Sequence, residues 1–161
     1  MTDLDLQKEL ANELRDHLLD DGIMMVRGKE FKDINVFKQD LPIKSDGDED
    51  EDDDKIWNYI IVMIGDEDVV DGEWKVEIHF LIGIEDKDLQ CQGNMNIAYI
   101  MNEIYMHLRK ETFTGNRKEY EMEEEAHKRF NLNADYPYYE GDLITYWKLP
   151  LPLNQGLEEF L

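Results

Sequence analysis

The sequence contains one cysteine, Cys91, among its 161 residues. A single cysteine excludes an internal disulfide and any Cys-based zinc cage. Cys91 follows Gln90 and precedes Gln92, so its neighbours supply no positive charge that would favour a reactive thiolate. We therefore expect no catalytic cysteine, and we expect the protein to be made in a reducing cytoplasm.

Basic residues are scarce as well. Lys and Arg number 17 against 39 Asp and Glu, which gives a formal charge of −22. This balance argues against a nucleic-acid binder and against docking on an anionic membrane. The longest apolar run, Tyr59 to Ile64, is far too short to span a bilayer, and the acidic start lacks the features of a signal peptide. Because 42% of residues are hydrophobic, the chain is long and apolar enough for one folded domain, 1–161.

Hydrophobic periodicity predicts two long helices. Leu10, Leu14 and Leu18 recur every four residues within Leu4 to Leu19, and Thr2 is placed to cap this helix. A second helix is expected over Met95 to Lys110. Six candidate strands accompany the helices, at residues 23–26, 34–41, 56–64, 74–84, 118–122 and 142–149; residues 121–129 remain open between a short helix and a loop.

The clearest strand is Trp74 to Ile84, where every second residue is apolar. With Ile56 to Ile64 it predicts a long antiparallel hairpin, whose turn we expect at Gly65 to Glu73. The element order predicts an α+β fold: an antiparallel or mixed sheet with the long hairpin, and two main helices packed on one face. A short C-terminal tail is expected from about residue 150, because Pro150 and Pro152 end the last strand.

Eight of the nine residues from Asp46 to Asp54 are acidic. Neither register of this block places a glycine sixth and a glutamate twelfth, as a helix-loop-helix calcium site requires. Two interpretations remain: a solvated loop, or a loop whose Asp48, Asp50 and Asp52 bind divalent ions weakly and without specificity. We expect no dedicated metal site and no cofactor.

No pattern in the sequence indicates catalysis. His17, His79, His107 and His127 form no metal-binding helix pair and stand in no nucleophile motif. Glycine-rich phosphate loops are also lacking. The residues alone therefore indicate a binding or structural protein and not an enzyme.

A pattern near the C-terminus resembles that of a known protein family. Tyr136-Pro137-Tyr138-Tyr139-Glu140-Gly141-Asp142-Leu143, followed by Thr145, Trp147 and a proline-ended strand, resembles the ending of the tail terminator (tail completion) proteins of long-tailed bacteriophages. The helices, the hairpin and Asp86 follow in the same order as in that family, and the resemblance covers about Leu4 to Pro152. Two positions depart from the family pattern: Gly93-Asn94-Met95-Asn96 lacks the usual Tyr and Asp, and Lys55-Ile56-Trp57 lacks a proline.

The resemblance implies a structural virion protein at the head-proximal end of the tail. Such proteins form a ring, typically a hexamer, that caps the tube of major tail protein and offers a surface to the head-tail connector proteins. DNA would pass through the ring without specific binding. A ring lining rich in Asp and Glu would suit this passage, because it repels the phosphates of the DNA backbone. Two alternatives remain: another connector or head-completion protein, or an acidic DNA mimic that inhibits an enzyme.

The site residues that we predict are interface and corner residues and not catalytic ones. Val69 and Val70, an apolar pair amid acids, are the first interface candidates, either exposed to a partner or folded back on the hairpin. Ile34 and Val36, on an expected exposed edge, are the next. Tyr136, Pro137, Gly141 and Trp147 are predicted to form a structural corner, in which Gly141 permits a turn and Trp147 enters the core.

Overall fold

The computed structural model describes residues 2–40, 57–90, 92–110, 120–133 and 135–151. The acidic block 46–54, with Asp48, Asp50 and Asp52, lies outside these described residues, as do Cys91 and the tail beyond residue 151. Weak divalent binding by the three aspartates therefore stays a prediction.

The main sheet has five strands in the order β3-β4-β5-β7-β6. Their bounds are β3 Asn35–Lys38, β4 Tyr59–Val70, β5 Glu73–Glu85, β6 Glu121–Phe130 and β7 Tyr138–Leu149. Among the described strands, only β3 and β4 pair in parallel; every other pair is antiparallel. A separate two-stranded hairpin joins β1 Met24–Val26 to β2 Lys29–Phe31. The α+β fold with a mixed sheet is confirmed.

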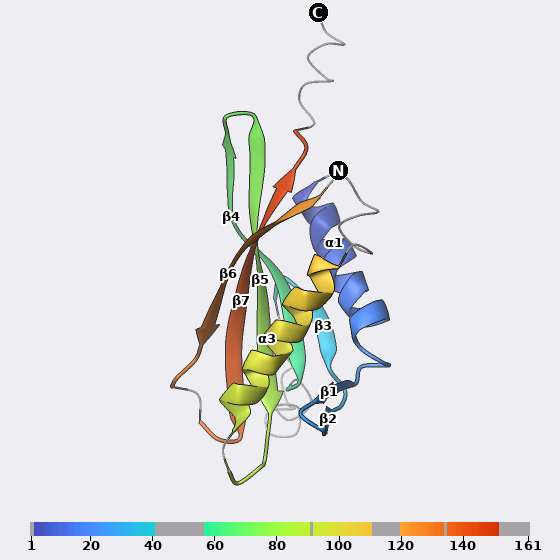
Figure 1. The fold of residues 1–161 in the computed structure, drawn as a ribbon, viewed down its shortest axis with the longest axis vertical. Helices are drawn as coiled ribbons and strands as arrows, with labels where there is room; N and C mark the ends of the chain where they lie inside the picture. Colours follow the sequence, from blue (N-terminus) through green and yellow to red (C-terminus); the bar gives the residue numbers. More distant parts are fainter. Residues whose placement is uncertain (1, 41–56, 91, 111–119, 134, 152–161) are drawn as a thin grey trace, which may run out of the picture.

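Both long helices lie on one side of the sheet (Figure 1). The first, α1 Asp3–Glu13, continues as a π-helical turn over Leu14–Leu18 and contacts β3 and β4. The second, α3 Gly93–Arg109, contacts β5, β6 and β7. Thr2 caps α1 as predicted: its hydroxyl accepts from the Asp5 amide while the Asp5 carboxylate accepts from the Thr2 amide, at 3.0 Å.

The core lies between the helices and the sheet face that they cover. Alternate residues of β5, from Val76 to Ile84, point into it and are 0–1% exposed. They pack with the apolar stripes of the helices, which include Leu10 of α1, Leu14 of the π-helical turn and Ile104 of α3. Burying each such side chain stabilises the fold by about 1.5–3 kcal/mol. The helices thus cover the sheet face to which the alternate apolar residues of β5 point.

Several strand limits differ from the predictions. The strand β2 is not among those predicted, β7 begins four residues earlier than expected, and β6 runs through Phe130 where the sequence leaves a helix or a loop open. β6 carries Glu121 and Glu123 to Glu125, which have low strand propensity. β7 pairs with Glu121 and Met122 and, after a register shift that spans Glu123 to Glu125, with Ala126 to Phe130; the hydrogen bonds on both sides of this shift outweigh the local preference.

Candidate interaction surface

The β4–β5 hairpin projects beyond the helices at one end of the molecule (Figure 1). We call its projecting part, residues 68–75, the arm. The predicted turn at Gly65 to Glu73 is wrong, because β4 continues to Val70 after a register shift between Ile64 and Glu67. The chain reverses only at Asp71 and Gly72, whose φ angles are 54° and 77°. A tight two-residue hairpin turn needs a positive φ angle at both of its central residues. The dipeptide Asp71-Gly72 therefore indicates the position of the turn in the sequence.

Val69 and Val70 are 60% and 56% exposed on the arm. The interpretation in which they fold back on the hairpin is therefore wrong. Val69 pairs with Trp74 and Val70 with Glu73, and neighbouring residues of a strand point to opposite faces. The arm thus presents one valine on each face.

Acidic side chains surround both valines. Five acidic residues outnumber two cations here, Lys75 and Lys148, which lie 3.8 and 3.9 Å from the Glu73 carboxylate; the acids are Asp66, Glu67, Asp68, Asp71 and Glu73. Trp74 Nε1 donates to Glu67 Oε1 at 3.1 Å. Burial and a hydrogen bond with Asp3 raise the pKa of the Glu67 carboxyl, as is usual where carboxylates crowd together. A protein surface that meets the arm must therefore offer apolar contact together with positive charge.

The other predicted interface residues are not available to a partner. Ile34 and Val36 are each only 6% exposed and belong to the core. The prediction of an exposed apolar edge is corrected here: β3 is at the edge of the sheet, but α1 packs over its inner face, where Val36 is buried beside Ile60. The outward backbone groups of this edge are partly used as well, because the Val36 carbonyl accepts from Arg15 Nη2 at 2.7 Å and the Ile34 amide donates to the Gly22 carbonyl at 2.9 Å.

The Gln39 side chain closes the neighbouring edge of β4. Its amide donates to the Ile64 carbonyl at 3.3 Å, and its carbonyl oxygen accepts from the Ile64 amide at 3.0 Å. Gln7 of α1 in turn holds Gln39 at 2.7 Å. Beyond Ile64 no described strand pairs with this edge of β4, so the arm carries an open edge as well as exposed valines.

On the helix-free face of the sheet, His79 lies between two carboxylates. Its Nδ1 donates to Asp142 Oδ2 at 2.8 Å, and its Nε2 is 3.5 Å from Glu77 Oε1. The hydrogen bond to Asp142 raises the pKa of His79; partial burial opposes this rise, and the Glu77 charge adds to it. Both ring nitrogens face carboxylates, an arrangement that favours the protonated imidazole over the neutral form that a general base requires.

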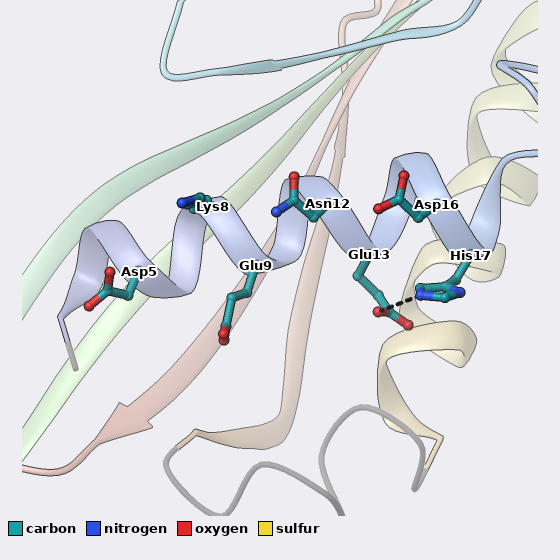
Figure 2. A pocket seen from close by; sticks show the side chains of 7 residues that line it. All are labelled: Asp5, Lys8, Glu9, Asn12, Glu13, Asp16 and His17. Atoms are coloured by element: carbon teal, nitrogen blue, oxygen red, sulfur yellow. Dashed lines mark ion pairs between the residues drawn. The ribbon is translucent and has the colours of Figure 1, made fainter.

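A hollow of about 550 Å³ runs along α1. Figure 2 shows its described lining, which comes from this one helix: Asp5, Lys8, Glu9, Asn12, Glu13, Asp16 and His17. Glu13 accepts from His107 of α3 at 3.0 Å and approaches His17 at 3.9 Å, so it ties the two helices together. Since the described polar groups come from one helix and do not converge from several elements, the hollow lacks the character of a ligand pocket.

The predicted corner is built mainly as expected. Trp147 is fully buried, and its Nε1 donates to Thr145 Oγ1 at 2.9 Å. Pro137 and Tyr136 fasten the corner to the end of β5, because the Pro137 carbonyl accepts from the Asp86 amide and the Tyr136 hydroxyl donates to the Lys87 carbonyl, both at 2.7 Å.

The role given to Gly141 needs correction. Gly141 lies inside β7 and not in a turn. A Cβ there would meet Ile97 Cγ2 at 2.4 Å and Met101 Cε at 2.6 Å. A glycine is needed because α3 packs directly against this point of the strand.

A second surface, which the sequence analysis did not identify, lies where the β1–β2 hairpin meets the start of α3. Met25, Met95 and Tyr99 are exposed there, and Met25 is 61% exposed. Arg27 contacts two of them: its guanidinium lies 5.5 Å from the Tyr99 ring centre, and its Nη1 is 3.8 Å from Met95 Sδ. Met25 stands two residues before Arg27 in the β1–β2 hairpin. We call these four residues the far-end patch.

The far-end patch has a rigid foundation. The buried Asp86 carboxylate accepts from Lys29 of β2, from Asn96 of α3 at 2.8 Å and from the Asp88 amide at 3.1 Å. Burial would raise the pKa of Asp86, but these hydrogen bonds outweigh burial and lower it. A charged Asp86 therefore fixes the hairpin relative to the helix that completes the patch.

Comparison with protein-family models gives no match, and comparison with curated proteins gives none either. The described helices include none that is long and apolar enough to cross a membrane. Over the same residues, no group of three or more His, Cys, Asp or Glu side chains is arranged to hold a metal ion.

Sequence reasoning found Val69 and Val70 but missed the far-end patch. Met25 and Arg27 lie more than 60 residues before Met95 and Tyr99 in the chain. None of the four residues belongs to a sequence motif that would indicate an interface. Met25 alternates with buried Met24 and Val26, which is a signal for a two-sided strand but not for a contact with α3.

Proposed function

We propose that this protein is a structural virion protein that forms a ring on the end of a phage tail tube. The ring ends tube polymerisation and offers the joining surface for the head. Its partners are further copies of itself, the major tail tube protein and the head-tail connector proteins, and its place is the head-proximal end of the tail. The mechanism is geometric: subunits joined through two different surfaces close into a ring and leave no open end.

The arm is the observation that carries this proposal. A monomer gains nothing from a projecting hairpin with an exposed valine on each face, since it leaves apolar area in water. A protein that caps a tube needs a projecting apolar element to reach its neighbours. The resemblance of the segment from Tyr136 to Trp147 to tail terminators gives the same indication independently.

Changing Val69 and Val70 together to lysine tests the proposal. We expect unchanged circular dichroism and melting, because both side chains are exposed. In a phage that depends on this protein, we expect tails that grow beyond normal length or fail to take heads. Electron microscopy of the particles measures both effects. The matched control is Leu132→Lys, which alters another exposed apolar residue, 82% exposed and far from the arm in sequence.

Tails of normal length that join heads at the normal rate in the Val69 and Val70 variant would remove the arm from the contact. If the wild-type protein neither binds tube ends nor forms rings in the presence of tube, the proposal as a whole is wrong.

A further inference from the structure

The arm lies at one end of the long axis of the molecule, and the β1–β2 hairpin and the start of α3, which carry the far-end patch, lie toward the other end (Figure 1). Both carry exposed apolar side chains, and they do not overlap. A contact between unlike surfaces on two copies is heterologous, and repetition of it leads to a ring or a filament. The placement of the two surfaces therefore suits head-to-tail association.

The charges of the two surfaces are complementary. On the arm, Asp68 lies on the same face as Val70, because the two are two residues apart in one strand. In the far-end patch, Arg27 is exposed and forms no ion pair with any described residue. Its contacts are the Gln92 side-chain carbonyl oxygen at 3.1 Å, Met95 and Tyr99. A carboxylate arriving from outside would find this guanidinium held in place and unneutralised.

The apolar parts are also suited to each other. A valine is small and rigid at χ1, whereas methionine has three rotatable bonds and fills irregular gaps. Met95 contacts Arg27, and Met25 stands two residues before Arg27 in the same hairpin, so both methionines can adapt to Val70 without movement of the backbone. Asp86 holds the hairpin and the helix beneath them, so little conformational freedom is lost on binding.

We propose that the arm of one copy docks on the far-end patch of the next copy, with Val70 against Met25 and Met95 and with Asp68 facing Arg27. This inference rests on the proposed function, since it names the contact that closes the ring.

Cysteine cross-linking tests the contact. In a Cys91→Ser background, a Val70→Cys copy is mixed with a Met25→Cys copy of different mass, in the presence of tail tube, and oxidised. We expect mixed dimers between the two variants and little product from either variant alone. A chain that carries both cysteines should give a ladder that ends at the ring size. Leu132→Cys mixed with Val70→Cys is the matched control and should give no specific product.

Charge reversal provides a second measurement. Arg27→Glu should slow the mixed cross-linking about fivefold, as loss and reversal of an exposed ion pair does, and Asp68→Arg in the partner should restore it. Melting curves establish that these exposed substitutions leave each variant folded.

Strong cross-linking of Val70→Cys to itself would overturn the inference, because it would show a symmetric pairing of arms. Rings of normal size without any product between residues 70 and 25 would also overturn it, while leaving the proposed function intact. Conversely, a specific product between these residues in a protein that never caps a tube would uphold the contact and refute the proposed function.

Discussion

At the scale of single residues, Trp147 occupies the centre of the core. Trp147 pairs with Val76 on one side and with Met122 on the other, so it lies where three strands meet. Its indole nitrogen donates to Thr145 Oγ1, and that hydroxyl donates in turn to the Ile78 carbonyl at 3.0 Å. A large apolar side chain and a satisfied polar group thus occupy one buried position.

Trp147→Ala should therefore unfold the domain or lower its free energy of unfolding by about 3–5 kcal/mol, as truncation of a large core side chain does. Urea unfolding followed by circular dichroism measures the loss. Leu132→Ala, which removes an exposed side chain, is the control and should change little. If the Trp147 variant is as stable as the parent yet fails to join tails, Trp147 belongs to the ring interface.

His79 should make stability depend on pH. Its pKa is raised in the folded protein, chiefly by Asp142, so its contribution is fully present below the unfolded value of about 6.5. The contribution is lost as the pH rises through the folded pKa. We expect the free energy of unfolding to fall over this window and His79→Gln to flatten the fall. Urea titrations at several pH values measure it, with exposed His17→Gln as the control; an unchanged slope in His79→Gln would contradict the prediction.

At the scale of elements, the parallel pair β3–β4 is the least common feature of the sheet. Antiparallel neighbours need only a short turn, but parallel strands need a connection that returns along the strand. Between Lys38 and Tyr59 there are 20 residues, which include the acidic block. The four residues of β3 extend only about 13 Å, so much of this connection exceeds what the return requires.

Deletion of Asp46 to Asp54 should leave the fold intact. Eleven of the 20 connecting residues would remain, and these reach up to about 36 Å when extended. A shorter loop also lowers the closure entropy slightly. A cooperative thermal melt within a few degrees of the parent is the expected result. Loss of folding would show that the block is a structural ion site.

At the scale of the whole molecule, charge opposes the assembly that the surfaces favour. Six copies at −22 each would carry −132 in formal charge. Repulsion of this size is screened within about 8 Å at physiological ionic strength. It would keep free copies apart until a tube end concentrates them.

We therefore expect a monomer in dilute buffer, and a shift toward ring-sized species when magnesium or salt is added. Native mass spectrometry with and without magnesium, and sedimentation at two salt concentrations, measure the shift. A stable dimer under every condition would contradict the prediction, because an isologous dimer cannot propagate into this ring.

Local patterns in the sequence determined much of the fold. The leucine spacing of α1 with its Thr2 cap, the apolar periodicity of α3 and the alternation from Trp74 to Ile84 predicted both helices and the central strand, because each depends on residues close in sequence. The apolar pair Val69 and Val70 was also visible, as an anomaly among acids.

Only the tertiary structure decided what depends on distant partners. Glu-rich β6 is a strand because β7 pairs with it, and β4 runs on to Val70 because a bulge carries it past Gly65. Val36 is buried because α1 packs on the inner face of β3, a contact between elements that the sequence of β3 does not contain. The far-end patch exists because the Asp86 carboxylate, at the end of one strand, holds a hairpin and a helix that are separated by more than 60 residues.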